Sequence, residues 1–292
     1  MQRVLAATDF SPHAERALAH ALELVKLFGA ELEVFTSAYV PAQALAAMAL
    51  GMAPGLVDEA RREAVQRVET LAATLRARGV RASSSSSTEE PSSAICARAA
   101  ELGTDLVALG TRGHTGLAHV VFGSIAERVA RTAPCAVLTT HADSPAPAAY
   151  RCVLVPTDFS PDSEAALAWA RSLVSRTGGK LVLLHAYDLP QLVLTGSALA
   201  AASVEKALMD SAREKLAELR QTLSGVAVET HVSATRPDPA ILDAVERVHA
   251  DLVVLGTRGR TGLAHVVLGS TAERVIRRAH VPVVTCKSGA RR

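Results

Sequence analysis

A stretch punctuated by glycine occurs twice in the 292-residue sequence with the same spacing. It reads GTRGHTGLAHVVFGS from Gly110 to Ser124 and GTRGRTGLAHVVLGS from Gly256 to Ser270, so both copies fit the pattern G-x2-G-x9-G-S. Glycine lets a backbone turn sharply or approach a ligand closely. A helix that starts after the last glycine offers free N–H groups and a positive dipole end to an anion. The pattern therefore predicts a loop that binds phosphate.

The residues after the last glycine are typical of a helix start. They are Ser124-Ile-Ala-Glu-Arg in the first copy and Ser270-Thr-Ala-Glu-Arg in the second. We expect each serine to cap its helix and the glutamate that follows to complete a capping box. The alternative is that the glycines only form a long turn. The loop between the glycines is longer than a strand-to-helix turn requires, and long ordered loops in compact domains are usually functional.

An aspartate follows the first apolar run of each copy. Asp9 lies in TDFSP and Asp158 in TDFSPD. In one interpretation Thr-Asp only starts a turn, and the Ser-Pro that follows caps the next helix. In the other, the carboxylate ends a strand and accepts hydrogen bonds from an adenine amine or a ribose hydroxyl. The glycine loop favours the second interpretation, because it supplies a place for the phosphates of the same ligand.

Other residues offer weaker signals. Arg112 and Arg258 lie inside the loop, where each could reach a phosphate or simply remain solvated. His119 and His265 also repeat, but no second ligand lies at zinc spacing, so we expect no protein-bound metal site. No Ser-His-Asp or Cys-His arrangement can be argued from the sequence. Since no catalytic base is evident, rapid catalysis is not expected.

The repeat extends over the whole chain and indicates two copies of one domain. RVLAATDFSPHAERALAHA from Arg3 parallels CVLVPTDFSPDSEAALAWA from Cys152, and the similarity returns at both glycine loops. A period near half the chain is too long for a solenoid repeat. We therefore expect one domain over residues 1–142, a second over residues 150–288, and a linker rich in Ser, Pro and Ala over residues 143–149.

Each copy alternates strands with helices. Short β-branched apolar runs predict strands, and apolar residues at helical spacing predict helices. The serine run Ser83–Ser87 has the composition of a linker, but it aligns with the plausible strand Glu229–Ser233, so we predict a polar edge strand. The remaining predicted strands are Val4–Thr8, Glu31–Phe35, Leu106–Leu109 and Ala136–Thr139 in the first copy, and Val153–Thr157, Lys180–Leu184, Leu252–Leu255 and Pro282–Thr285 in the second.

This alternation predicts an α/β fold with a parallel sheet in each copy. Right-handed crossovers place helices on both faces of such a sheet. The strand order 3-2-1-4-5 would bring the carboxyl ends of the first and fourth strands together, at the point where open α/β sheets bind ligands. Those ends carry Asp9 and Gly110 in the first copy and Asp158 and Gly256 in the second.

Composition and charge exclude several classes of protein. The formal net charge of +2, with acids and bases interspersed, argues against a nucleic-acid-binding face. Apolar runs such as Leu181–Leu184 are the length of a strand and far short of a membrane span. The N-terminal MQRVLAATDF has no signal segment, and the four cysteines form no CxxC pair. We therefore expect a cytoplasmic protein with reduced thiols and no disulfide framework.

The combination of TD-x-S after the first strand with G-x2-G-x9-G-[ST] after the fourth resembles the universal stress protein family. The resemblance covers both copies, so the chain is similar to tandem members of the family, and its intact glycine motif is similar to that of the ATP-binding branch. The resemblance implies two Rossmann-like domains of the adenine nucleotide alpha hydrolase type, each with a five-stranded parallel sheet. It also implies a role in stress response or signalling.

The resemblance further implies one ATP site in each domain. Asp9 and Asp158 would hold the adenosine part, and the glycines with the residues after them would surround the triphosphate. Mg²⁺ would be held mainly by the bound phosphates. The expected site residues are Thr8, Asp9, Gly110, Arg112, Gly113, Gly123, Ser124 and Ile125 in the first domain, and Thr157, Asp158, Gly256, Arg258, Gly259, Gly269, Ser270 and Thr271 in the second.

Two other functions stay open beside ATP binding without rapid turnover. A slow ATPase or nucleotidyl-transfer enzyme would need a placed base and a second substrate pocket, and the sequence indicates neither. A structural dimerisation module would bind no nucleotide. Because edge strands need cover, we expect the two domains to pack as an intrachain pseudo-dimer through their final strands. A homodimer of whole chains is compatible with this arrangement.

Overall fold

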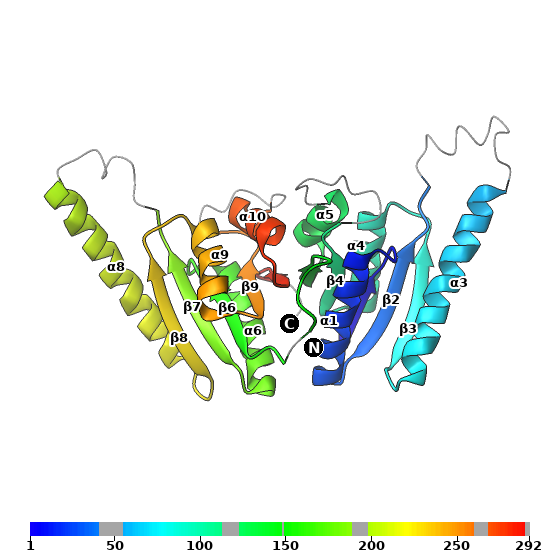
Figure 1. Ribbon diagram of the computed structural model, residues 1–292, viewed down its shortest axis with the longest axis horizontal. Coiled ribbons are helices and arrows are strands. Elements are labelled where there is room, and N and C mark those ends of the chain that lie inside the picture. Colours follow the sequence, from blue (N-terminus) through cyan, green and yellow to red (C-terminus); the bar gives the residue numbers. More distant parts are fainter. Residues whose placement is uncertain (41–54, 113–122, 148, 189–197, 260–267, 290–292) are drawn as a thin grey trace. The chain divides into compact units, whose positions relative to one another are not determined.

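The computed structural model describes residues 1–40, 55–112, 123–147, 149–188, 198–259 and 268–289. The chain divides into two compact units, the first running from Met1 to Asp143 and the second beginning at Ser144. Each unit alternates strands with helices, as the coloured ribbon in Figure 1 shows. Within the described ranges, no helix combines the length and hydropathy needed to cross a membrane. All four cysteines are free thiols.

The first unit contains a parallel sheet with the strand order β3-β2-β1-β4-β5. Its strands are β1 (Arg3–Ala7), β2 (Glu31–Ser37), β3 (Ala82–Ser87), β4 (Leu106–Gly110) and β5 (Ala136–Thr140). Its helices are α1 (Pro12–Phe28), α3 (Leu56–Ala77), α4 (Pro91–Leu102) and α5 (Ser124–Thr132). The side chains of the central strands are buried, as expected for a parallel sheet covered on both faces.

The second unit repeats this topology with the strand order β8-β7-β6-β9-β10. Its strands are β6 (Cys152–Pro156), β7 (Lys180–Ala186), β8 (Ala227–Ser233), β9 (Leu252–Gly256) and β10 (Val283–Cys286). Its helices are α6 (Pro161–Thr177), α8 (Ala198–Gln221), α9 (Pro237–Val248) and α10 (Ser270–Arg278). The predicted order 3-2-1-4-5 is confirmed in both units.

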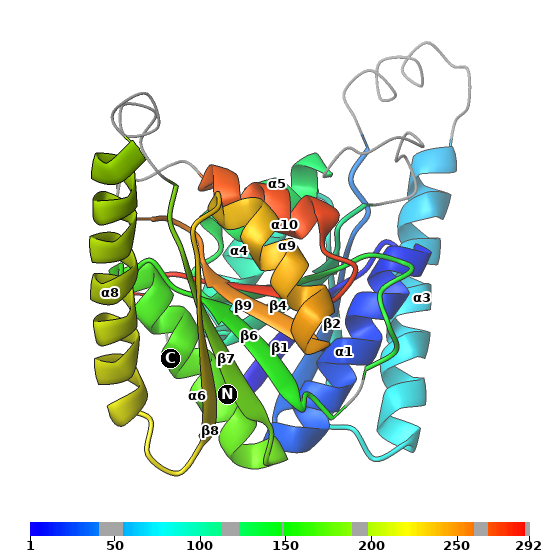
Figure 2. The same cartoon turned by 60° about the vertical axis from the view of Figure 1, so that its left-hand side comes forward.

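The order of the strands decides where the helices and the loops lie. Right-handed crossovers place α1 and α3 on one face of the first sheet and α4 and α5 on the other. The helices α4 and α5 pack against each other, as do α9 and α10, which Figure 2 shows side by side. Since β1 pairs with β4 and β6 pairs with β9, the loops that follow these strands adjoin.

The serine run is a strand, as its alignment with the second copy predicts. It pairs with β2 over six residues, from Leu32 opposite Ala82 to Ser37 opposite Ser87. Its polar character is explained in part by Glu33, whose side chain is only 8% exposed on β2. The Ser85 hydroxyl donates to that carboxylate, and Arg98 forms an ion pair with it at 2.7 Å. The serines therefore belong to the sheet and do not form a linker.

The predicted helix caps next to the first strand of each unit are confirmed. Ser11 accepts a hydrogen bond from the backbone N–H of Ala14 at the start of α1, and Ser160 accepts one from Ser163 at the start of α6. Gly29 and Gly178 end the same helices with φ of 60° and 64°. These caps fix where α1 and α6 begin, and so set the distance from each strand to the helix that follows.

Candidate functional site

The carboxyl ends of β6 and β9 border a cavity of about 190 Å³ in the second unit. Apolar side chains from β7, α9 and the end of β6 form one part of its wall, and the loop after β9 with the first turn of α10 forms another. All the residues that the sequence predicts for the second domain line it. They are Thr157, Asp158, Gly256, Arg258, Gly259, Gly269, Ser270 and Thr271.

Asp158 and Gly259 lie against each other in this cavity. A Cβ atom placed on Gly259 would be 2.9 Å from Oδ2 of Asp158, so a larger residue would press on the carboxylate. The other oxygen, Oδ1, accepts a hydrogen bond from the backbone N–H of Ser160 at 3.1 Å. In the first unit, Oδ1 of Asp9 accepts from Ser11 in the same way at 3.0 Å. The expected turn is thus present in both units, where Oδ1 of the aspartate accepts the hydrogen bond of the turn. The other oxygen of Asp158, Oδ2, faces the glycine loop.

The glycines that end β4 and β9 are explained by helix packing. A Cβ on Gly110 would lie 2.6 Å from Cβ of His13, and a Cβ on Gly256 would lie 2.9 Å from Cβ of Asp162. Both positions are too close for any side chain, because backbone atoms of α1 and α6 lie equally near. At these two sites, the proximity of a helix accounts for glycine without a ligand.

The two ends of each glycine loop are held together by a backbone hydrogen bond. The N–H of Gly123 donates to the carbonyl of Thr111 at 2.9 Å, and that of Gly269 donates to Thr257 at 2.8 Å. A Cβ on Gly123 would lie 2.8 Å from the same carbonyl oxygen. The loop therefore returns to its starting point before the helix begins, and the glycine is required for that return.

The capping boxes expected at Ser124 and Ser270 are wrong. The N-caps are Gly123 and Gly269, both in extended conformation, and neither α5 nor α10 has a side-chain cap hydrogen bond. Each helix begins one residue earlier than the capping box requires, so the serine occupies the first helical position. The correction matters for chemistry, because an N-terminus without a side-chain cap keeps N–H groups available to an outside acceptor.

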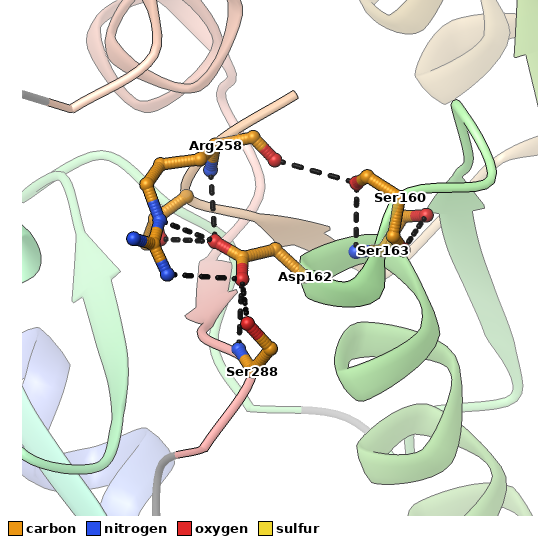
Figure 3. Close-up of polar contacts among 6 residues, drawn as sticks. Ser160, Asp162, Ser163, Arg258 and Ser288 are labelled. Atoms are coloured by element: carbon orange, nitrogen blue, oxygen red, sulfur yellow. Dashed lines mark hydrogen bonds and ion pairs between the residues drawn. The ribbon is translucent and has the colours of Figure 1, made fainter. Parts of the chain in front are cut away.

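Arg258 lines the cavity but is held by Asp162, the second residue of α6 (Figure 3). Its Nε donates to Oδ2 of Asp162 at 3.1 Å, its Nη2 to Oδ1 at 3.3 Å, and its backbone N–H to Oδ2 at 3.2 Å. Thr257 donates its hydroxyl to Oδ2 at 2.9 Å, and Ser288 donates its backbone N–H at 2.8 Å and its hydroxyl at 2.6 Å to Oδ1. One carboxylate thus joins α6, the loop after β9 and the segment after β10.

The environment keeps Asp162 ionised. Burial by itself raises the pKa of this carboxyl group, whose side chain is only 4% exposed. The hydrogen bonds from Arg258, Ser288 and Thr257 act in the opposite direction and leave the pKa below its ordinary value. Sequence reasoning missed this residue. The available signal was the difference between TDFSPH and TDFSPD, where His13 stands in the place of Asp162.

The first unit places its predicted site residues at the matching positions. Two of these residues follow β1, and one is the last residue of β4. Another lies two residues after β4, and the last three are at the start of α5. In that order they are Thr8, Asp9, Gly110, Arg112, Gly123, Ser124 and Ile125. Gly113 lies outside the described residues, as do the repeated histidines at 119 and 265. Over the part of the chain that the structure describes, no cluster of His, Cys, Asp or Glu could hold a metal ion.

A sequence model described as the universal stress protein family matches residues 1–141 and 149–287. The chain belongs to this family. Universal stress protein Rv2005c of Mycobacterium tuberculosis is 35% identical over 187 residues, which cover 63% of this chain and 62% of that relative. Universal stress protein MJ0531 of Methanocaldococcus jannaschii is 30% identical over 140 residues, which cover 47% of this chain and 82% of that protein.

The likeness to solved structures extends over both domains. A universal stress protein from Archaeoglobus fulgidus matches with a TM-score of 0.72 at 26% identity, over 98% of this chain and 96% of that one. The chain is therefore a tandem universal stress protein with two Rossmann-like α/β domains. The match to the curated mycobacterial relative spans less than two thirds of its length, so its activity and partners are no guide to this chain.

Proposed function

We propose that this universal stress protein binds one adenine nucleotide, ATP, in each domain. We further propose that it acts in stress response or signalling in the cytoplasm, without rapid catalysis. The observation that carries the proposal is the cavity after β6 and β9, in which the Asp158 carboxylate, the glycine loop and the start of α10 come together. In the first domain β1 pairs with β4 as β6 pairs with β9 in the second, and this equivalence supports extending the proposal to the first domain.

The start of α10 would take the phosphates. Its first residues, Ser270 and Thr271, line the cavity, and its N-cap, Gly269, supplies no side-chain cap. Free N–H groups and the positive end of the helix dipole attract an anion at such a terminus, an effect of up to about 2 kcal/mol for a charge in a favourable site. A glycine N-cap supports this assignment, because the acceptor that its side chain cannot supply can come from a phosphate oxygen.

The opposite side of the cavity would take the adenosine. Leu184, Ala186 and Ile241 supply apolar surface, against which a purine ring can pack. Asp158 also lines the cavity, with Oδ2 next to Gly259, where that oxygen could accept a hydrogen bond from a ribose hydroxyl or the adenine amine. Mg²⁺, if bound, would be held mainly by the phosphates.

The remaining parts of the proposal follow from the repeat. We assign the first nucleotide to Thr8, Asp9, Gly110, Arg112, Gly113, Gly123, Ser124 and Ile125. Domains over residues 1–142 and 150–288, with a linker over 143–149, would form an intrachain pseudo-dimer, and whole chains could form a homodimer. A slow ATPase is the second candidate, and the experiment that follows decides between the two.

Direct analysis of bound ligand tests the proposal. Purified protein is denatured, and the released small molecules are identified by chromatography and mass spectrometry. Isothermal titration with ATP, ADP and AMP then gives the number of sites and their affinities. We expect ATP to bind at two sites per chain. The finding that neither released nucleotide nor any binding heat can be detected would refute the proposal, and hydrolysis at an ordinary enzymatic rate of about 10 s⁻¹ would favour the enzyme.

A matched pair of variants assigns the second site. Asp158→Asn keeps an oxygen that can accept from Ser160 but removes the charge beside the loop. We expect ATP affinity at one site to fall roughly 10- to 100-fold, the range for losing a hydrogen bond to a charged group. Asp210→Asn on α8 is the control, because Asp210 is exposed and its ion pair with Arg213 is long, at 3.9 Å. Equal affinities in the two variants would contradict the assignment.

A further inference from the structure

The two domains place different side chains at one equivalent position beside the phosphate loop. His13 and Asp162 are each the second residue of a helix, α1 and α6, that begins with Ser-Pro. Both pack on the glycine that ends the neighbouring strand, Gly110 or Gly256. The backbone is therefore equivalent in the two domains, and the difference between them lies in the side chain.

In the second domain the Asp162 side chain forms an ion pair with Arg258, the arginine of the glycine loop. The Asp162 carboxylate accepts hydrogen bonds from Nε, Nη2 and the backbone N–H of Arg258. Ser288 also donates its backbone N–H to this carboxylate. Figure 3 shows the guanidinium turned to Asp162. Paired charges in such a buried arrangement are costly to separate. A phosphate near Arg258 would have to compete with a carboxylate that is already in place.

In the described part of the first domain, no carboxylate holds the loop arginine as Asp162 does. Thr111, the counterpart of Thr257, turns its hydroxyl to the carbonyl of Thr140 at 3.1 Å and lies 3.1 Å from Nδ1 of His141. Among the described residues, no acidic side chain forms an ion pair with Arg112 within 4 Å. The guanidinium of Arg112 is thus not committed to a carboxylate as that of Arg258 is.

The titratable and charged groups around His13 do not replace the ion pair that Asp162 forms with Arg258 in the second domain. Burial, and then the charges of His141 and Arg112, lower the pKa of His13, against the opposing effect of Asp143 and Asp9. His13 is therefore held in its neutral form near Arg112. Because it is neutral, it neither neutralises the arginine nor competes with a bound anion for it.

We infer that the two domains are unequal polyphosphate sites, in which Arg112 contributes its charge to the phosphates and Arg258 is withheld from them by Asp162. The inference rests on the proposed binding of ATP and specifies which arginine serves it. Asp162 is a positioning residue that acts through Arg258. The residues after β5 and β10 also differ: His141, Ala142 and Asp143 in the first domain align with Lys287, Ser288 and Gly289 in the second. The variants in the test leave all of these residues unchanged.

Titration of the full chain with ATP at low and at high salt tests the inference. Arg112→Gln should weaken one site roughly tenfold and flatten its dependence on salt, since a contact between charges is lost. Arg112→Lys should restore most of the salt dependence. Asp162→Asn should strengthen the other site several-fold and steepen its salt dependence. In the double variant Asp162→Asn with Arg258→Gln, that gain should disappear.

The titrations distinguish a failure of this inference from a failure of the proposed ATP binding. Unchanged binding in both Arg112→Gln and Asp162→Asn, with ATP bound by the wild-type chain, would overturn the inference and leave the proposed function intact. No ATP binding by the wild-type chain would instead refute the proposed function. If Asp162→Asn does not fold, Asp162→His is the second variant, because histidine stands at the equivalent position of α1. A merely structural role for Asp162 would change stability without changing the salt dependence.

Discussion

Replacement of Gly256 by alanine tests whether helix packing, and not a ligand, requires glycine at the end of β9. The added Cβ would lie 2.9 Å from the backbone carbon and from Cβ of Asp162, and 2.9 Å from the backbone nitrogen of Ser163. None of these atoms is the end of a flexible side chain. The start of α6 would have to move away from the strand, and the ion pair of Asp162 with Arg258 would be distorted with it.

The expected cost follows from this geometry. Overpacking of a well-filled interior typically costs 1–3 kcal/mol, so we expect roughly that loss of unfolding free energy. Alanine restricts the unfolded chain more than glycine does, which offsets about 0.4–1 kcal/mol. From the middle of both ranges, the remaining loss of about 1.3 kcal/mol corresponds to a fall of roughly 4 °C in the midpoint of thermal unfolding for a domain of this size, with an upper end of about 8 °C.

The single tryptophan provides the assay. Trp169 lies on α6, the helix that would have to move. Its fluorescence reports unfolding around that helix, while circular dichroism reports the whole chain. Gly110→Ala is the matched variant in the first domain, where the added Cβ would meet His13 at 2.6 Å. It should destabilise the protein by circular dichroism. A fluorescence transition in Gly256→Ala identical to that of the wild type would refute the packing argument.

Three further predictions concern neighbouring contacts. Gly259→Val should abolish ATP binding at the second site with little loss of stability, because its Cβ meets only the end of the Asp158 side chain. Isothermal titration measures the binding and thermal unfolding measures the stability. Unaltered binding would show that the loop does not bind the phosphates. Asp162, whose pKa is lowered in the folded protein, should contribute stability that is present above its ordinary pKa of 3.8 and lost as pH falls through its lowered value. Unfolding of Asp162→Asn, followed by Trp169 fluorescence, should therefore depend less on pH below 4. Arg98→Met leaves the buried carboxylate of Glu33 without its cation and should cost roughly 3 kcal/mol in urea unfolding; a loss no larger than that of an exposed ion pair would contradict this.

The fold was largely predictable because it is repeated and locally encoded. The sequence order of strands and helices, with the handedness of crossovers, left few topologies to consider. The strand Ala82–Ser87 shows the value of the repeat, since its composition alone favours a linker. It pairs with β2 over six residues, and its Ser85 contacts the buried Glu33 together with Arg98. These contacts join residues far apart in the sequence, which composition does not reveal.

The site was less predictable, and its two misses have physical causes. The capping boxes depended on placing a helix start to within one residue, and the return of Gly269 to the carbonyl of Thr257 moves that start. The ion pair of Asp162 with Arg258 joins residues 96 positions apart. Side-chain direction at such a distance depends on how α6 packs on β9, which residue types and spacing do not specify.

The duplication makes the chain its own control for separating structural from functional residues. Where both domains keep a residue and the same backbone contact uses it, as with Gly123 and Gly269, the contact is enough to explain the residue. Where the backbone is kept and the side chain differs, packing cannot explain the difference, because both side chains fit. His13 and Asp162 are such a pair beside the glycine loop, and only Asp162 forms an ion pair with the arginine of its loop. The inferred difference between Arg112 and Arg258 would therefore distinguish the two domains by the salt dependence of their nucleotide binding.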